Sequence, residues 1–390
     1  MKLIANLKLL SLALAATLAL PVPGWAGGVT DNEIVVGSIQ DLSGPVAMLG
    51  EHFRQGMQMR FDEANAAGGV SGRKIRLIVE DSGWDTKKGV LAARKLLDKD
   101  DVFALINTLG SSIAVATIPL ALEKSVPSLF PAAPVPVTYE PISPYKFSVD
   151  MPYELQVPIG VRYLVKTGNY KNIGVIYQDD DFGKDVIKGL TAITKELGKP
   201  ICEQSSFRRG ATDFSSQVSR VKSAGCDLIV IGGSTRETIG IMSEARKQDW
   251  KPGFLVTASA YSAQLHQLGG AGVDGLYATV SFPHPYADGA TPQLTAWIKS
   301  YKDRFNADPS PFSTMGYLKA DLFVRAIEKV GKNLTADSLS KVLDTFTYTG
   351  GDLFGVPNIQ FRPDDHLGLR HVRIAQVRDG RWRMMTEALK

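Results

Sequence analysis

The sequence predicts an α/β fold with two lobes, each built on a parallel central sheet that helices cover on both faces. The chain has 390 residues, which is more than one ordinary domain contains. Apolar strand-like runs alternate with helical segments through the first half, and the same alternation begins again near residue 172. Because strands that alternate with helices form parallel sheets, the repeat predicts two such lobes.

The first half contains strands separated by helices. Phe53, Met57 and Phe61 recur at the spacing of one helix face, and Gly68-Gly69 follow where that helix is expected to end. Ser111 and Ser112 are expected to cap a later helix. The predicted order is strand 33–39, helix 53–64, strand 75–79, helix 90–97, strand 103–106, helix 111–122 and strand 127–130.

The second half repeats this order. Ser234 and Glu237 have the spacing of a capping box, in which the serine hydroxyl and the glutamate carboxylate satisfy free amides at a helix start. The predicted order is strand 172–177, helix 183–197, strand 201–207, helix 214–224, strand 227–231, a helix from 234 and strand 254–257. Beyond residue 283 we expect helices around 317–327 and 335–346, then β-like segments at 359–361, 371–377 and Trp382.

Charge and cysteine content narrow the classes of function. The 44 Lys and Arg barely outnumber the 40 Asp and Glu, so no concentrated basic face is expected and no nucleic-acid partner is predicted. The two cysteines, Cys202 and Cys226, fall on elements that flank a common predicted strand. That placement would leave them too far apart to bridge, so two separate thiols are expected.

The first 26 residues have the pattern of a secretory signal peptide. Lys2 and Lys8 precede an apolar run over 9–20, helix-breaking residues follow, and small residues stand at 26–28. The apolar run is shorter than the roughly 20 residues that span a bilayer, although an uncleaved anchor is the alternative. We therefore expect cleavage near Ala26 and an exported, periplasmic protein.

No catalytic or metal-binding constellation is visible in the sequence. The stretch Asp179-Asp180-Asp181 is typical of a helix cap, and the glycines over 68–72 lack the Gly-Lys-Ser/Thr ending of a phosphate loop. Catalysis needs a nucleophile, base or metal set, and the histidines have no metal-ligand spacing. We expect no enzyme, no metal and no cofactor; the histidines are His52, His266, His284, His366 and His371.

An ordered set of segments resembles the type I periplasmic solute-binding proteins, most closely the branched-chain amino acid (Leu/Ile/Val) group that serves ABC importers. The matching segments are Gly37–Ile39 with Leu42–Ala47 and Gly50, Asn65–Ile75, Gly110–Ser112, Asp180–Gly183 and Asp364–Gly368. The resemblance implies two Rossmann-like lobes joined by a multi-crossover hinge. It also implies lobe closure over a small solute, membrane permease and ATPase subunits as partners, and a monomer.

The resemblance also implies lobe boundaries and site residues. One lobe would comprise 29–147 with 284–349, and the other 148–283 with 350–390. Ser111 and Ser112 stand at a helix N-terminus, which favours an anion, and the family holds a ligand carboxylate with the matching serine. The further candidates are Leu49, Ala132, Ala133, Pro134, Phe182, Ser234, Thr235, Ser259, Tyr261 and Phe312.

Two departures from the family bear on the ligand. Pro134 stands where amino acid binders usually have a threonine, and proline supplies neither a hydroxyl nor an N–H. Ser259 stands where they place a glutamate that pairs with the ligand ammonium, and a buried ammonium without a carboxylate is costly. The sequence therefore favours a small organic acid without an ammonium. Aromatic candidates that would suit a flat body are Tyr261, Phe282, His284, Tyr286, Phe312 and Tyr317.

Three alternatives remain open at this level. An apolar amino acid would bind if Asp41 or Glu154 accepted its ammonium. Arg236 would add a cation for a carboxylate or phenolate if its side chain reached the cleft. A sensory protein would deliver its closed state to a membrane receptor instead of a permease.

Overall fold

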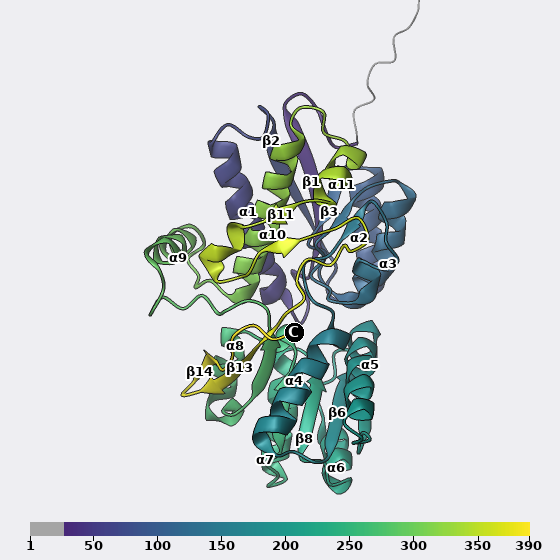
Figure 1. Ribbon diagram of the computed structural model, residues 1–390, viewed down its shortest axis with the longest axis vertical. Coiled ribbons are helices and arrows are strands. Elements are labelled where there is room, and N and C mark those ends of the chain that lie inside the picture. The colour runs from purple at the N-terminus through teal and green to yellow at the C-terminus, as the bar shows by residue number, and fades with distance from the viewer. Residues whose placement is uncertain (1–26) are drawn as a thin grey trace, which may run out of the picture.

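The computed structural model describes residues 27–390. The predicted signal peptide and its cleavage near Ala26 lie outside the described residues. Two lobes stand one above the other, and the chain passes between them several times (Figure 1). No helix within residues 27–390 combines the length and the apolar character needed to cross a membrane.

The upper lobe has a five-stranded parallel sheet in the order β2-β1-β3-β4-β5. Helices α1 and α10 pack with one face of the sheet in the largest apolar core, and α2 and α3 pack with the other face. The elements are β1 (Glu33–Gln40), α1 (Ala47–Ala66), β2 (Lys74–Asp81), α2 (Thr86–Asp98), β3 (Ala104–Ile106), α3 (Ser111–Glu123), β4 (Ser128–Leu129), β5 (Lys146–Phe147), α10 (Pro311–Val330) and α11 (Ala336–Leu343).

The lower lobe has a seven-stranded sheet in the order β14-β13-β10-β9-β8-β6-β7, in which β13 pairs antiparallel with both β10 and β14. Helices α4 and α5 pack with one face, and α6, α7 and α8 with the other. The elements are α4 (Tyr153–Gly168), β6 (Ile173–Gln178), α5 (Asp181–Glu196), β7 (Gln204–Phe207), α6 (Ser215–Ser223), β8 (Leu228–Gly232), α7 (Thr235–Lys247), β9 (Gly253–Val256), α8 (Ala263–Gly269), β10 (Tyr277–Val280), β13 (Arg373–Arg378) and β14 (Arg381–Met384).

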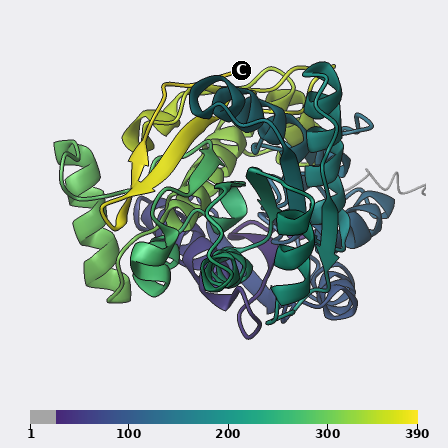
Figure 2. The same cartoon turned by 90° about the horizontal axis from the view of Figure 1, so that it is seen from below.

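Helix α9 (Pro292–Phe305) stands at the side of the molecule, on the same side as the β13–β14 hairpin, in both ribbon views (Figures 1 and 2). It follows the second passage between the lobes, which runs from β10 in the lower lobe to α9 itself. Its Trp297, Ile298 and Tyr301 are buried against the upper core. Helix α9 therefore belongs to the upper lobe, beside the waist between the two lobes.

Two glycines let α1 and α10 cross at close range. A Cβ on Gly56 would lie 2.0 Å from the Ser313 carbonyl oxygen, and a Cβ on Gly316 would lie 2.4 Å from that of Phe53. No side chain larger than hydrogen fits at either position. The close crossing places Phe53 and Phe312 edge to face, with ring centroids 5.4 Å apart, at the end of the upper lobe that faces the lower one.

The third passage between the lobes comes later than the predicted boundary at residue 350. The short strands β11 (Thr347–Tyr348) and β12 (Ile359–Gln360) pair with each other. Phe361 then stacks on Phe130 at 5.9 Å and meets Phe147 edge to face at 5.3 Å. These contacts keep residues 350–369 with the upper lobe, because their aromatic rings are buried in its core. The chain therefore crosses to the lower lobe only after this segment.

The expectation of two separate thiols is wrong, since Cys202 and Cys226 form a disulfide. The elements do flank the central strand β6, as predicted, but each cysteine stands two residues before its strand begins. The two segments that lead into these strands approach each other, and the Cα atoms of the two cysteines are 6.0 Å apart. A Cβ on Gly174 of β6 would lie 2.7 Å from the Cys226 sulfur, so this glycine leaves the space in which the bridge crosses the strand.

Removal of this disulfide is expected to destabilise the protein by about 3 kcal/mol, because the bridge closes a loop of 24 residues and restricts the unfolded chain. Urea unfolding of the double variant Cys202→Ser/Cys226→Ser measures the loss. Reductant should destabilise the wild-type protein by a similar amount and leave the double variant unchanged. Equal stability of oxidised and reduced wild type would contradict this prediction.

Candidate functional site

The carboxyl ends of several parallel strands from both lobes meet around one cavity, as open α/β sheets predict. We call it the inner cavity, and its volume is about 80 Å³. The upper lobe contributes segments that follow β3 and β4 together with α1 and α10, and the lower lobe contributes segments that follow β6, β8 and β9. Its lining is mainly apolar: Val46, Leu49, Phe53, Trp84, Leu109, Gly110, Ser111, Ala132, Pro134, Tyr153, Gln178, Asp180, Phe182, Arg209, Ser234, Ala258, Ser259, Phe312 and Met315.

Eight of the predicted site residues line this cavity together. They come from seven separate parts of the chain, most of them at the ends of strands or the starts of the helices that follow. Their side chains are small or apolar apart from three hydroxyl groups. They are Leu49, Ser111, Ala132, Pro134, Phe182, Ser234, Ser259 and Phe312.

Four other predicted site residues do not line the inner cavity. The Ser112 hydroxyl is buried without a hydrogen-bond partner, and Ala133 packs in the core beneath α4. Thr235 hydrogen-bonds Ser262 at 3.0 Å, which ties α7 to the start of α8. Tyr261 is buried, and its hydroxyl accepts a hydrogen bond from the backbone of His284 at 3.0 Å. For Ser112, Ala133 and Thr235 an adjacent residue lines the cavity instead, and near Tyr261 the lining residues are Ala258 and Ser259.

The N-terminus of α3 forms one wall of the inner cavity. Its N-cap residue Gly110 has φ +102°, and a Cβ there would lie 3.0 Å from the Trp84 ring. The glycine therefore allows the helix start to lie directly against the indole. Ser111, the first helical residue, is 5% exposed. The first amides of a helix have no acceptor within the helix, so this wall presents donors and a partial positive charge to the cavity.

A cation joins the two lobes at the cavity wall. Arg209, which follows β7, donates to the Trp84 carbonyl oxygen of the upper lobe at 2.7 Å and to Asp180 of the lower lobe at 2.5 Å. Its guanidinium carbon also lies 4.8 Å from the centre of the Trp84 ring. Trp84 has φ +60°, a conformation that costs free energy for a residue other than glycine. The bridge can exist only when the lobes are together.

Sequence reasoning missed Arg209, Trp84, Gln178 and Tyr153 as wall residues. The bonded pair Arg209 and Trp84 lies 125 residues apart, and neither residue belongs to a local motif. The signal that could have found Gln178 is its position at the end of β6, directly before the predicted cleft loop. Arg236, which the sequence analysis considered as a cation for the ligand, is exposed on α7 and does not line the cavity. Its guanidinium lies 3.4 Å from the Glu237 carboxylate.

Asp180 is the acidic residue on the inner cavity wall, and its two oxygens are fully engaged. One oxygen accepts from the amides of Phe182 at 3.1 Å and Gly183 at 3.3 Å, which caps α5. The other accepts from Gln178 at 2.6 Å and from Arg209. The carboxylate is therefore neutralised before any ligand enters.

The acids that could replace the missing glutamate lie elsewhere. Asp41 is buried and holds its own loop through the amides of Gly44 at 2.6 Å and Val46 at 2.9 Å. Glu154 pairs with Lys188 on the flank of α5. At position 259 itself, the serine hydroxyl donates to the Gly233 carbonyl oxygen at 2.9 Å. Neither of the two proposed acceptors faces the inner cavity.

Few of the aromatic candidates surround the inner cavity. Phe312 lines it directly, whereas Tyr317 packs on Trp297 and Phe354 and donates to Glu63. Tyr261 and Phe282 border a smaller cavity of about 30 Å³. Among residues 27–390, no group of three or more His, Cys, Asp or Glu side chains is arranged to hold a metal ion.

Comparison with known proteins identifies relatives along nearly the whole chain. A family model described as periplasmic binding protein matches residues 33–381. Leu/Ile/Val-binding protein homolog 7 of Brucella suis biovar 1 (strain 1330) is 28% identical over 356 residues, which cover 88% of this chain and 87% of that protein.

Solved structures share the fold. A fatty acid ABC transporter substrate-binding protein from Thermomonospora curvata matches with a TM-score of 0.84 at 25% identity, over 93% of this chain and 94% of that one. The branched-chain amino acid transporter substrate-binding protein LivJ from Streptococcus pneumoniae, in complex with isoleucine, matches with a TM-score of 0.77 at 22% identity, over 92% of this chain and 99% of that one. The second likeness concerns the fold alone.

Proposed function

This chain belongs to the periplasmic binding protein family, and we propose that it is the substrate-binding component of an ABC importer that captures a small organic carboxylate without an ammonium group. The observation that carries this proposal is the make-up of the inner cavity. A helix N-terminus forms one wall, while the acid on the wall is already paired with Arg209. The remaining lining is largely apolar, which suits an aliphatic or aromatic body.

The α3 wall favours a carboxylate. Ser111 and the first amides of α3 offer hydrogen-bond donors, and the helix dipole adds a favourable field for an anion. Pro134 supplies no donor on the neighbouring loop after β4, so the carboxylate would rely on α3. The Thermomonospora curvata protein is described as the substrate-binding protein of a fatty acid ABC transporter, and a fatty acid is a carboxylate without an ammonium.

The second candidate ligand is an apolar amino acid. The observation in its favour is that Asp180 is on the cavity wall, so a ligand ammonium that displaced Arg209 could pair with it. The Brucella suis relative is named as a homologue of Leu/Ile/Val-binding proteins. We favour the organic acid, because displacement of Arg209 from Asp180 would disturb the bridge that this arginine forms between the two lobes.

The mechanism follows from a site that both lobes share. A solute bound on α3 contacts the upper lobe first, and closure then adds contacts from the lower lobe, such as Phe182 and Ser259. These extra contacts stabilise the closed state relative to the open one. The closed protein would then deliver the solute to the membrane permease and ATPase subunits of the importer, in the periplasm.

A thermal-shift screen tests the proposed ligand class. Ligands that bind the folded state alone raise its melting temperature. One panel contains apolar amino acids, and the other contains aliphatic and aromatic carboxylates without an amine. We expect shifts with the second panel. Shifts confined to leucine, isoleucine or valine would favour the second candidate.

Replacement of Ser111 by alanine is expected to weaken carboxylate binding by roughly 10-fold, because a hydrogen bond to a charged group contributes about 1.5–3 kcal/mol and the α3 amides remain. Calorimetry with the best carboxylate of the screen measures the change. Ser112→Ala is the matched control, because the Ser112 hydroxyl is buried and does not line the cavity. This substitution also leaves the backbone amides of α3 in place. Unchanged affinity of the Ser111 variant would refute the assigned role.

A further inference from the structure

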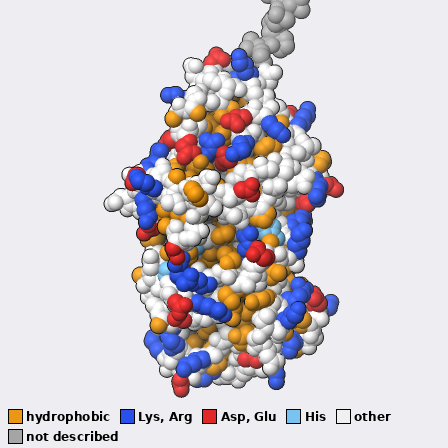
Figure 3. All heavy atoms as spheres, turned by 60° about the vertical axis from the view of Figure 1, so that its left-hand side comes forward, with side chains coloured by type: hydrophobic (Ala, Val, Ile, Leu, Met, Phe, Trp, Pro, Cys, Tyr) orange, Lys and Arg blue, Asp and Glu red, His pale blue; other side chains and the backbone are white. Residues whose placement is uncertain are grey.

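A second pocket lies between the lobes, directly outside the inner cavity. We call it the outer pocket, and its volume is about 450 Å³. Helix α1, the residues before α10 and helix α9 line it from the upper lobe, and α8 lines it from the lower lobe. A space-filling view from this side shows a waist between the lobes where hydrophobic side chains and histidines reach the surface (Figure 3). His284 and Tyr286, two of the aromatic candidates from the sequence, line this pocket and not the inner cavity.

The outer pocket and the inner cavity share a wall. Leu49 and Phe312 line both of them, and they are 8% and 6% exposed. The side chains of Leu49 and Phe312 therefore form part of the wall that separates the two compartments. Both side chains would have to adopt other rotamers to open a route between the two compartments. A solute longer than the inner cavity would have this route available.

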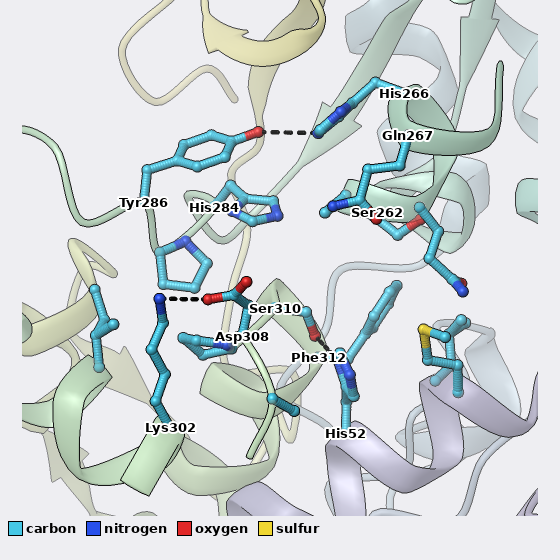
Figure 4. A pocket seen from close by; sticks show the side chains of 18 of the residues that line it. His52, Ser262, His266, Gln267, His284, Tyr286, Lys302, Asp308, Ser310 and Phe312 are labelled. Carbon is cyan, nitrogen blue, oxygen red and sulfur yellow. Dashed lines mark hydrogen bonds and ion pairs between the residues drawn. The ribbon is translucent and has the colours of Figure 1, made fainter. Parts of the chain in front are cut away.

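The outer pocket contains an unsatisfied histidine. Both ring nitrogens of His284 are buried and have no hydrogen-bond partner. The ring stacks on Tyr286 with centroids 4.0 Å apart, and Figure 4 shows it directed into the middle of the pocket. A buried polar group without a partner costs about 1–3 kcal/mol. A ligand group that met these nitrogens would recover that cost.

Several other polar side chains of the pocket have partners. His52 bonds Ser310, Tyr286 lies 3.4 Å from His266, and Lys302 pairs with Asp308 at 2.5 Å (Figure 4). The cation and the acid of the pocket therefore pair with each other at its exposed rim. Burial, assisted by the neighbouring positive charges of His266 and Arg381, lowers the pKa of His284 to about 3. A neutral imidazole offers one donor and one acceptor.

We propose that the solute spans both compartments, with its carboxylate on α3 and, next to His284, a neutral group such as a hydroxyl or an amide. This inference rests on the proposed function and names its substrate class as an elongated monocarboxylate with a polar far end. The apolar middle of the solute passes between Leu49 and Phe312. A hydroxyl both donates and accepts, so it matches what neutral His284 lacks.

The test is calorimetry with matched pairs of straight-chain acids, each with and without a terminal hydroxyl: butanoate, hexanoate and octanoate against their ω-hydroxy forms. In at least one chain length, the hydroxyl should raise affinity for the wild type by roughly 3- to 10-fold, as one recovered hydrogen bond predicts. His284→Phe should abolish this preference, and His284→Gln should retain part of it. His371→Phe, which replaces a buried histidine outside both compartments, should leave the preference intact.

The outcomes separate the two proposals. If carboxylates bind but the hydroxyl gives no advantage at any length, the spanning solute is wrong and the proposed function stands. The same holds if the preference survives in a folded His284→Phe variant, as judged from its melting temperature. If no carboxylate binds, the proposed function fails and the spanning solute fails with it.

Discussion

Replacement of Arg209 by alanine is expected to weaken solute binding by about 10- to 100-fold, the largest loss among the single variants of the cavity. Arg209 bonds the Trp84 carbonyl oxygen across the lobes and the Asp180 carboxylate within its own lobe. Hydrogen bonds that involve a charged group contribute about 1.5–3 kcal/mol each. Because the contact to Trp84 requires the lobes to be together, its loss lowers the stability of the closed state that holds the solute.

Two measurements check this expectation. Calorimetry gives the affinity, and small-angle scattering of the solute-bound protein should show a more open average shape for the variant. Arg208→Ala is the matched control, because the neighbouring arginine is exposed and does not line the inner cavity. If the variants Arg209→Ala and Arg208→Ala bind the solute equally well, Arg209 does not act as a bridge between the lobes.

Replacement of Lys319 by methionine is expected to destabilise the protein by about 3–5 kcal/mol, because it leaves a buried carboxylate without its cation. Lys319 on α10 is completely buried and lies 2.6 Å from Asp150, which stands in the first passage between the lobes. The ammonium also bonds Asn107 at 3.1 Å. Burial raises the pKa of Asp150 and lowers that of Lys319, and each partner opposes the shift of the other.

Urea unfolding measures the loss, and a second substitution identifies its cause. The double variant Lys319→Met/Asp150→Asn should recover much of the stability, since it no longer buries an unpaired charge. Lys329→Met on the same helix is the control, because that lysine is exposed and should change stability by less than about 1 kcal/mol. A Lys319 variant that loses as little as the control would contradict this role of the ion pair.

The elements that sequence periodicity predicted are those with an amphipathic face or a continuous apolar run. Strand β1 and helix α3 begin and end within one or two residues of the predicted bounds. Helix α4 was missed, because its start follows Pro152 and Pro158 lies inside it. Proline within a segment normally argues against a helix, and here packing of Val157, Val161 and Leu164 against β6 outweighs that tendency.

The parts of the site that sequence analysis could not predict depend on long-range contacts. The loops at the strand ends were predicted because a parallel sheet places them together whatever their sequence. The bridge from Arg209 to Trp84 depends on how the two lobes meet, and no local pattern in the sequence indicates that contact. The disulfide was missed for a similar reason, since it depends on the space above Gly174, a residue that belongs to neither cysteine segment.

The central claim is that the inner cavity binds a carboxylate and has no free acid for an ammonium. Calorimetry with three matched pairs tests it most directly: leucine and 4-methylpentanoate, valine and 3-methylbutanoate, and phenylalanine and 3-phenylpropanoate. Within each pair the two compounds differ by the amine alone. We predict that every pair with measurable binding favours the acid without the amine by at least about 10-fold, since an ammonium would be buried without a free partner. Tighter binding of an amino acid than of its deaminated partner would contradict the claim.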